Sequence, residues 1–463
     1  MNMTKLPATT IEELKRNVSG RVVLPHDDAY EGARKIWNAM IDKHPALIVL
    51  CAATSDVVRA VNFARDNGLL LAVRGGGHNI AGSATCDDGI VIDLSQMKAA
   101  SVDPGTRRVT VEGGATLADF DAATQAHGLA TPLGINSTTG VAGLTLGGGF
   151  GWLSRKYGMT IDNLESAEVV TAAGEVVRAS ATEHPDLFWA LRGGSGNFGV
   201  VTRFEFRLHP VGPDVLSGMI VYPFAEAKRV LQQYREFTAK APDELSVWAV
   251  LRKAPPLPFL PEQVHGKEIV ALALLYSGDP SQGEPLIEPL RKFGTPVGEH
   301  VGVQPYTAWQ QAFDPLLGPG ARNYWKSHNF SRLDDKLFDA VIEYIGKLPS
   351  PQGEIFFGAI GGATTRAAPD SAAYAHRDAQ FVMNVHGRWE DPDDDERCIG
   401  WARDFYNASA PFASSGVYVN FLTADEGDRV RSAYGTNYDR LAQVKRKYDP
   451  DNLFRTNQNI KPA

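Results

Sequence analysis

The chain has 463 residues, with 46 basic and 54 acidic side chains that give a net charge of −8 at pH 7. A chain of this length exceeds what one hydrophobic core normally holds, so we expect at least two lobes with room for a buried cofactor or substrate. No basic run or basic-aromatic ladder occurs, which argues against a nucleic-acid surface and favours a small-molecule partner.

The cysteines Cys51, Cys86 and Cys398 lie far apart and have no C-x-x-C spacing. This pattern indicates neither a disulfide framework nor a zinc site, so we expect reduced thiols and no metal. The N-terminus lacks the apolar core of a signal peptide, and no later run approaches the roughly 20 apolar residues of a membrane span. We therefore expect a cytoplasmic protein that does not bind membranes, although a twin-arginine substrate cloned without its leader would look the same.

The chain begins with a β-α-β pattern. Residues 47–50, 69–73 and 89–94 are predicted to form buried strands, and residues 55–67 an amphipathic helix that stops at Gly68. Parallel strands joined by a helix are the expected result.

The next region predicts further strands and one more helix. Residues 107–114 predict a strand, and residues 116–127 a helix that Gly128 closes at the C′ position. Residues 168–178 predict a hairpin that turns at Ala172-Ala173-Gly174. The composition changes after Pro210, where a proline-spotted segment precedes an aromatic-rich stretch up to about residue 410, which we interpret as a second lobe.

Two glycine loops are the most informative local features. The strand ending at Val73 runs directly into Arg74-Gly75-Gly76-Gly77-His78, and a second loop spans residues 147–151. Glycines without side chains let the backbone turn sharply and bring its N–H groups against a flat or anionic ligand. Neither loop matches G-x-G-x-x-G or G-x-x-x-x-G-K-[ST]. The loops therefore do not indicate a Rossmann dinucleotide-binding fold or a P-loop.

These loops belong to a longer ordered set of motifs, which are residues 73–78, 140–163, 186–201, 418–421 and 448–460. With this set the chain resembles the vanillyl-alcohol-oxidase superfamily of FAD-dependent oxidoreductases, and within it the bacterial berberine-bridge-enzyme-like oxidases. The resemblance covers about residues 40–211 and 412–463 and is thin between them.

The resemblance implies an α+β fold in which a PCMH-type FAD-binding domain with two subdomains accompanies an α+β substrate domain with an antiparallel sheet. Residues 1–211 would form most of the FAD-binding domain and residues 212–411 the substrate domain. Residues 412–463, with a predicted helix at 438–448, would return to the FAD-binding domain.

His78 is the central residue of the resemblance. In relatives the histidine at this position is joined through a ring nitrogen to the 8-alpha methyl of the flavin, which raises the reduction potential of the flavin. The alternative is an ordinary turn histidine that bonds a neighbour. Members with two linkages carry a cysteine where this chain has Asn136, and an amide cannot form a thioether, so we predict a single linkage and a small or flat substrate.

The resemblance also assigns the other cofactor residues. Backbone N–H groups in both glycine loops would bind the pyrophosphate, and Val200 or Val201 would border the adenine or serve as strand core. The predicted cofactor-binding set is Arg74, Gly75, Gly76, Gly77, His78, Asn79, Gly140, Gly143, Gly147, Gly148, Gly149, Gly151, Val200, Val201, Asn457 and Asn459.

Tyr418, Asn420 and Thr139 are the predicted catalytic residues. The first two match a Tyr-x-Asn segment that approaches flavin and substrate in relatives. Thr139 would lie beside the flavin carbon that dioxygen attacks, or would simply cap a loop. A tyrosine titrates at about 10, so Tyr418 needs a cationic neighbour to act as a base.

Candidate pocket residues in the second lobe complete the prediction. The cations are Lys326, His386 and Arg388, each of which could instead be an ion-paired or core residue, and the aromatic wall would be Trp248, Tyr306, Trp309 and Phe357. Glu354 lies on a strand whose facing the sequence leaves open.

We expect an oxidase that transfers a hydride from a small alcohol, amine or secondary metabolite to histidyl-linked FAD and returns electrons to dioxygen. The alternatives are a dehydrogenase with a quinone or protein acceptor and a tailoring oxygenase of secondary metabolism. A flavin-storing protein is disfavoured because Tyr418 and Asn420 are retained. We expect a monomer or homodimer.

Overall fold

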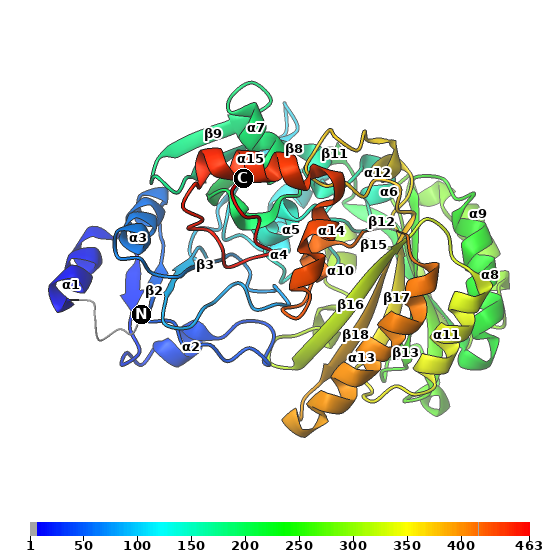
Figure 1. The fold of residues 1–463 in the computed structure, drawn as a ribbon. Helices are drawn as coiled ribbons and strands as arrows, with labels where there is room; N and C mark the ends of the chain where they lie inside the picture. Colours follow the sequence, from blue (N-terminus) through cyan, green and yellow to red (C-terminus); the bar gives the residue numbers. More distant parts are fainter. Residues whose placement is uncertain (1–6, 415) are drawn as a thin grey trace.

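The computed structural model describes residues 7–414 and 416–463 and arranges them in two lobes. In Figure 1 the first lobe lies at the left and top, and the second lobe, which contains one large sheet, lies at the right. The C-terminal helices, coloured red, return to the first lobe. The combination of helices with mainly antiparallel sheets confirms the expected α+β class.

The first sheet follows the predicted β-α-β order. Its strands pair in the order β1-β2-β4-β3, and β4 is parallel to both β2 and β3. Helix α3 connects β2 to β3 and ends before Gly68, which has a φ of +61°. The bounds are β1 (Arg21–Val23), β2 (Leu47–Leu50), α3 (Thr54–Asp66), β3 (Leu71–Arg74) and β4 (Ile90–Asp93).

The second sheet of this lobe is antiparallel, with the order β5-β6-β10-β8-β9. Strands β8 and β9 form the predicted hairpin, in which Gly174 has a φ of +80°. Helix α4 begins with a capping box between Thr116 and Asp119. The bounds are β5 (Ala100–Asp103), β6 (Arg108–Glu112), α4 (Leu117–Gln125), β8 (Leu164–Val170), β9 (Val176–Ser180) and β10 (Val200–Arg207).

The second lobe is a seven-stranded antiparallel sheet with the order β15-β12-β14-β13-β17-β18-β16. Helices α8 (Ala227–Thr238), α11 (Asp335–Ile345) and α13 (Asp395–Ser409) cover one face of it (Figure 1). The strands are β12 (Asp214–Pro223), β13 (Leu245–Lys253), β14 (Glu268–Tyr276), β15 (Gly298–Pro305), β16 (Arg322–Phe330), β17 (Glu354–Ala359) and β18 (Phe381–Trp389).

Period-two alternation divides the residues of this sheet between two environments. In β17, Ile355 and Phe357 pack against the covering helices, whereas Glu354 and Phe356 face the opposite side. The uncovered face of the sheet is therefore available to form the wall of a site.

An N-terminal strap, residues 35–41, joins the two lobes. The Trp37 N–H donates to Gly77 O at 3.2 Å in the first lobe, while Ala39 N–H donates to Ala321 O at 3.0 Å in the second. Asn38 Nδ2 donates to Asn323 O at 2.9 Å, and Asn323 N–H donates to Asn38 Oδ1 at 3.0 Å. These bonds attach the strap to the edge of the large sheet at β16 and hold that edge near the first glycine loop.

The C-terminal segment completes the first lobe. Helix α15 (Tyr438–Tyr448) lies beside α7 (Pro185–Leu191) (Figure 1). Its fully buried Lys445 donates to Asp449 at 2.7 Å, to Asn197 O at 2.7 Å and to Phe454 O at 2.8 Å. A buried charge is tolerated only when it is paired in this way.

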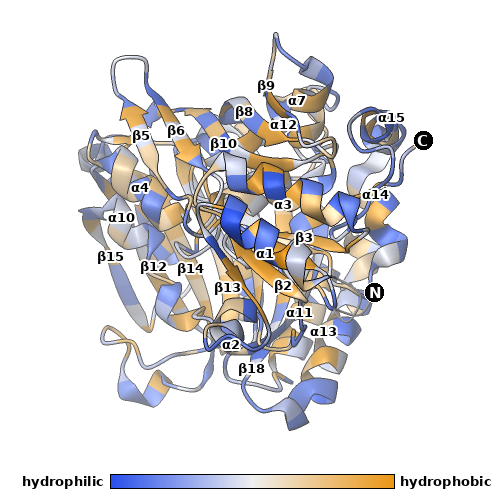
Figure 2. Ribbon diagram, turned by 90° about the vertical axis from the view of Figure 1, so that its left-hand side faces the viewer, coloured by the Kyte–Doolittle hydropathy of each residue, from blue (hydrophilic) through white to orange (hydrophobic). Residues whose placement is uncertain are grey.

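The remaining elements are short or peripheral. They are α1 (Ala8–Asn17), α2 (Tyr30–Arg34), β7 (Leu129–Ala130), α5 (Val141–Leu146), α6 (Ser154–Tyr157), β11 (His209–Pro210), α9 (Glu284–Ile287), α10 (Tyr306–Gln310), α12 (Ala363–Arg366) and α14 (Val430–Tyr434). Figure 2 shows β2 and β3 mostly in orange and the outward side of α15 in blue, as expected for a buried sheet and a surface helix. Among the described residues, no helix has the length and apolarity needed to cross a membrane.

Candidate active site

A cavity of about 330 Å³ lies between the first glycine loop and the uncovered face of the large sheet. Residues 75–79 after β3 line one side of it, and side chains of β13, β16, β17 and β18 line the other. The C-terminal residues 418–421 and 454–458 complete the wall. Segments that are far apart in the sequence therefore meet at one place.

The first glycine loop brings bare backbone to this cavity. A Cβ atom at Gly76 would lie 2.3 Å from Gly140 N, and a Cβ atom at Gly140 would lie 2.3 Å from Gly76 N, so neither position accepts a side chain. Gly77 has a φ of +72°, which favours glycine. Within the described residues, the backbone N–H groups of residues 75–79 have no hydrogen-bond acceptor. The loop thus offers a row of donors.

His78 follows the loop and is held in a defined tautomer. The Thr138 hydroxyl donates to Asn136 Oδ1 at 2.7 Å and lies 3.0 Å from His78 Nε2. Since its hydrogen is already used, Thr138 Oγ1 accepts, and His78 Nε2 carries the ring proton. The surrounding protein desolvates the ring and lowers the pKa of His78 to about 4. At neutral pH the imidazole is uncharged and Nδ1 has a lone pair.

Trp37 of the strap fixes the plane of this ring. Its indole stacks on His78 with a centroid distance of 5.0 Å and an interplanar angle of 19°. The indole Nε1–H donates to Leu317 O at 2.8 Å, and the Arg388 guanidinium lies over the Trp37 ring, 5.6 Å from its centroid. Residues of both lobes therefore orient His78.

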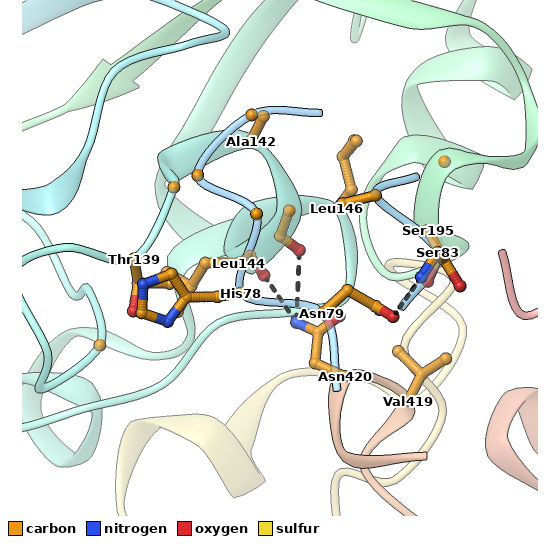
Figure 3. Close-up of a pocket in the computed structure, with 18 of the residues that line it drawn as sticks. His78, Asn79, Ser83, Thr139, Ala142, Leu144, Leu146, Ser195, Val419 and Asn420 are labelled. Carbon is orange, nitrogen blue, oxygen red and sulfur yellow. Dashed lines mark hydrogen bonds between the residues drawn. The ribbon is translucent and has the colours of Figure 1, made fainter. Parts of the chain in front are cut away.

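The second glycine loop positions Tyr418 and Asn420. A Cβ atom at Gly147 would lie 2.1 Å from Asn420 Oδ1, so the asparagine packs directly on the glycine. Asn420 Nδ2 donates to Gly143 O at 3.3 Å and Leu144 O at 3.2 Å (Figure 3). This loop therefore packs on the side of Asn420 that faces away from the cavity.

The Tyr418 oxygen accepts two hydrogen bonds, from Gly149 N–H at 3.1 Å and from Asn420 Nδ2 at 3.0 Å. Both bonds favour the phenolate, but burial outweighs them and raises the pKa of Tyr418 to about 12. The phenol is therefore protonated at neutral pH and its own hydrogen is available as a donor. No cation of the kind that a tyrosine base requires touches this hydroxyl in the described chain.

Glu354 brings a carboxylate to the sheet side of the cavity. Burial raises its pKa, but the positive guanidinium groups of Arg252 and Arg388 lower it, and the pKa of Glu354 lies below its usual value. Arg252 Nη1 donates to Glu354 Oε2 at 2.8 Å. The carboxylate is thus ionised and paired.

His386 stands beside this carboxylate. Asn323 Nδ2 donates to Ala321 O at 2.8 Å, which makes Asn323 Oδ1 the acceptor for His386 Nε2–H at 2.9 Å. His386 Nδ1 then lies 3.9 Å from Glu354 Oε1 and has a lone pair. Burial lowers the pKa of His386, so the neutral ring is able to accept a proton at Nδ1.

Most of the predicted site residues line the cavity. Tyr418 and the half-buried Thr139 do so from opposite segments, and Val200 and Val201 contribute apolar wall from β10. The full set is Gly75, Gly76, Gly77, His78, Asn79, Thr139, Gly140, Gly143, Val200, Val201, Tyr418, Asn420 and Asn457.

Six predicted cofactor-binding residues lie elsewhere. The Arg74 side chain turns away and pairs with Asp93 at 2.6 Å. Asn459 lines a neighbouring surface pocket. Four of these residues are glycines of the second loop that permit close packing rather than form the cavity wall. Gly147 packs against Asn420, Gly148 against Met159 and Tyr418, Gly149 against Thr160, and Gly151 against the Leu133 backbone.

The candidates in the second lobe divide in the same way. His386 and Trp248 line the cavity. Lys326 lies on the helix side of β16 and pairs with Asp425 and Glu426, each at 3.2 Å. The Arg388 guanidinium donates to Asn323 Oδ1 at 3.0 Å. Tyr306, Trp309 and Phe357 are core residues, and Phe356 takes the place predicted for Phe357 because strand neighbours face opposite sides.

The sequence did not predict Trp37, Thr138 or Asn384 as parts of this site. Each depends on contacts between distant segments, for which a single sequence has no local signal. Glu354, whose facing the sequence left open, lines the cavity. For Asn384 the sequence did contain one signal, because it lies two residues before His386 on the same strand and alternate strand residues share a face.

Comparisons with known proteins agree with this geometry. Residues 45–180 match a family model described as FAD binding domain, and residues 417–461 match one described as berberine and berberine like. A FAD-linked oxidoreductase of Dictyostelium discoideum is 34% identical over 457 residues, which are 98% of this chain and 97% of that protein. The (R)-6-hydroxynicotine oxidase of Paenarthrobacter nicotinovorans is 31% identical over 96% of this chain and 97% of its own length.

A solved structure is similar over its whole length. The crystal structure of 6-hydroxy-D-nicotine oxidase from Arthrobacter nicotinovorans has a TM-score of 0.86 and 30% identity, and the match covers 96% of this chain and 98% of that one. The expected PCMH-type fold is therefore confirmed.

The residues of the cavity fit FAD. The unpaired N–H groups of the first glycine loop suit the oxygens of a pyrophosphate. Thr456 Oγ1 and Asn457 Oδ1 are buried without a hydrogen-bond partner, and polar atoms in that state require a ligand or water. Val200, Leu71 and Leu94 supply apolar surface. None of the three cysteines is among the residues that line the cavity.

Proposed function

This chain belongs to the family of FAD-linked oxidoreductases with a berberine-like C-terminal region, and on that premise we propose that it oxidises a small organic alcohol, amine or secondary metabolite, with dioxygen as the electron acceptor. The observation that carries the proposal is the meeting of His78, Tyr418, Asn420 and Glu354 around one cavity. The protein is a FAD-dependent enzyme, and the substrate and acceptor are the proposed parts.

We assign the binding of FAD to residues 1–211 and 412–463, and the binding of substrate to residues 212–411. Bound FAD supplies a ring that accepts a hydride from the carbon bearing a hydroxyl or amine. The first glycine loop and Asn457 would hold the cofactor through backbone and side-chain hydrogen bonds, and the strands β13, β16, β17 and β18 would form the substrate wall.

A single covalent linkage through His78 is part of the proposal. An uncharged imidazole whose Nδ1 lone pair is unused is the form that acts as a nucleophile. The hydrogen bond from Nε2 to Thr138 and the stack on Trp37 support this form at neutral pH. Asn136 stands where a second, cysteinyl linkage would need a thiol.

The proton released with the hydride goes to the pair formed by His386 and Glu354. His386 Nδ1 accepts the proton, and the Glu354 carboxylate stabilises the imidazolium. Tyr418 donates its hydrogen bond to the substrate heteroatom, and Asn420 fixes the phenol. Thr139 lines the cavity from the first lobe, where a side chain would control access of dioxygen.

The proposal is tested on purified wild type, His78→Ala and His127→Ala, an exposed histidine that serves as the control. Intact mass and fluorescence on a denaturing gel report the covalent flavin. Anaerobic reduction followed by exposure to air then reports the acceptor.

We expect the wild type and His127→Ala to retain flavin after denaturation, His78→Ala to lose it, and reduced wild type to reoxidise rapidly in air. Release of flavin from denatured wild type would refute the linkage. Slow reoxidation would instead favour a dehydrogenase with a quinone or protein acceptor.

A further inference from the structure

Asn384 is a buried amide that the protein leaves without partners. It lies on β18, its side chain lines the cavity, and 1% of its surface is exposed. Neither Nδ2 nor Oδ1 has a hydrogen-bond partner among the described residues. Asn323, on the adjacent strand β16, has partners for both amide atoms through Ala321, His386 and Arg388. Of these two amides, Asn323 has protein partners and Asn384 has none among the described residues.

An amide in this state is costly. A buried donor or acceptor without a partner has lost its hydrogen bonds to water without replacement, and Asn384 has both. Native proteins satisfy such groups with a ligand or with ordered water. Because the side chain faces the cavity, a molecule in the cavity is able to supply both partners.

The walls around Asn384 are flat and aromatic. Phe356, its neighbour in register on β17, stacks on Trp248 with a centroid distance of 5.6 Å and an interplanar angle of 10°. Trp325 meets Phe421 edge to face at 5.6 Å. The indole N–H groups of Trp248 and Trp325 also have no acceptor within the described structure. Such walls suit a planar molecule that carries an acceptor.

The charge of the cavity limits the ligand further. Among the described residues that line it, Glu354 has the formal charge, and Arg252 balances that charge at 2.8 Å. His386 is neutral because burial lowers its pKa. A carboxylate or ammonium group at Asn384 would therefore be buried without a counterion, which is strongly unfavourable.

We propose that Asn384 is a specificity-determining residue that binds the neutral edge of a flat aromatic substrate, where one hydrogen-bond acceptor and one donor stand side by side. An aromatic carboxamide or lactam has this edge, and it would form two parallel hydrogen bonds with the amide of Asn384. The inference rests on the proposed function, because it names the substrate class of the same cavity.

The test uses the FAD-loaded protein and two probes of nearly equal shape. Benzamide has the acceptor and the donor, whereas methyl benzoate has acceptors alone. Each probe is titrated anaerobically, and its dissociation constant is taken from the change in the visible flavin spectrum without turnover. The variants are Asn384→Leu and Asn384→Val, and Asn329→Leu is the matched control. Asn329 is another buried asparagine of this sheet with both amide atoms unpartnered, but it does not line the cavity.

We expect wild type and Asn329→Leu to bind benzamide at least about tenfold more tightly than methyl benzoate, and either Asn384 variant to reduce this ratio to about twofold or less. Equal binding of the probes by wild type, no binding of benzamide, or an unchanged ratio in the Asn384 variants would overturn the inference. A protein that shows no flavin spectrum after loading would overturn the proposed function itself. A normal flavin spectrum without discrimination overturns this inference alone.

Discussion

The tautomer of His78 depends on one hydroxyl group. Thr138 uses its hydrogen for Asn136 and therefore accepts from His78 Nε2, which leaves Nδ1 with its lone pair. Its neighbour Thr139 lines the cavity and makes no such bond with His78. Two adjacent threonines thus have separable roles.

We expect Thr138→Val to lower the fraction of covalently bound flavin several-fold, because without the hydroxyl the imidazole loses its fixed proton position. The measurement is the flavin absorbance that remains with the protein after acid precipitation. Thr139→Val is the matched control and should keep normal covalent flavin while changing the rate of reoxidation in air. Equal covalent fractions in the two variants would contradict the assigned tautomer.

The proposed role of Tyr418 is that of a hydrogen-bond donor, because burial raises the pKa of its phenol to about 12. We expect Tyr418→Phe to lower kcat/KM by at least about tenfold, within the range of general acid–base effects. The flavin content should be unchanged, since the phenol bonds Gly149 and Asn420 rather than the glycine loop at His78.

The pH profile of kcat distinguishes the two assignments of the proton acceptor. If Tyr418 were the base, activity would rise towards pH 12 and the phenylalanine variant would lose that limb. We expect an acidic limb that belongs to His386, below its ordinary pKa because burial lowers it, and that persists in Tyr418→Phe.

Single residues of this site were predictable only where a motif carried them. His78, Tyr418 and Asn420 stood in recognisable segments and do line the cavity. Arg74 stood in the same segment, but its side chain pairs with the buried Asp93, which one sequence alone does not reveal.

At the scale of elements, the N-terminal strap connects the two lobes and positions His78 through Trp37. Trp37 touches His78 through its ring and Leu317 through Nε1, so it contributes both stacking and a hydrogen bond. The two contributions are separable by substitution.

We expect Trp37→Phe to lower stability by about 1 kcal/mol, since it keeps a ring on His78 but loses the bond to Leu317 O. Trp37→Ala should cost about 3 kcal/mol or more, since it removes the whole side chain. The thermal midpoint and the covalent flavin fraction of each variant report the effect. Equal losses in the two variants would show that stacking on His78 contributes little.

The elements themselves were largely predictable, because their signals are local. The strands at 47–50 and 89–94 and the helix at 55–67 appear within two residues of their predicted bounds. Their apolar runs and 3.6-residue period can be recognised in the sequence without knowledge of distant contacts. The strap has no such period. The facing of Glu354 was open because a period of two fixes alternation but not which side is buried.

At the scale of the whole molecule, Asp121 of α4 meets Gln310 of α10 between the lobes. Gln310 Nε2 donates to the buried carboxyl at 3.0 Å. No cation pairs with Asp121 among the described residues, and burial raises its pKa to about 7. The folded state therefore holds a protonated carboxyl near neutrality.

This pKa has a defined consequence for stability. The folded pKa lies above the ordinary value of 3.8, so the stabilisation is complete below about pH 4 and is lost as the pH rises towards 7. We expect the thermal midpoint of wild type to fall between pH 5 and pH 8, and that of Asp121→Asn to fall less and to exceed wild type at pH 8. Asp66→Asn, which changes an exposed carboxylate on α3, is the control and should follow wild type.

The return of the C-terminal segment could be predicted only through the family resemblance. Its attachment depends on the buried Lys445, which bonds Asn197 and Phe454 from distant parts of the chain. Composition placed a second lobe after residue 210, and the large sheet does lie between Asp214 and Trp389.

The strands of the large sheet have two roles, core packing and lining of the cavity, and these roles fall on opposite faces of the sheet. In β17 and β18, one set of alternate residues packs against the helices, while Glu354, Phe356, Asn384 and His386 face the cavity. Mutations at Phe356 and Asn384 would change what the cavity accepts and leave the packing of the first set intact. The fold is therefore suited to divergence and to engineering, because new substrates can be acquired at alternate positions without rebuilding the core.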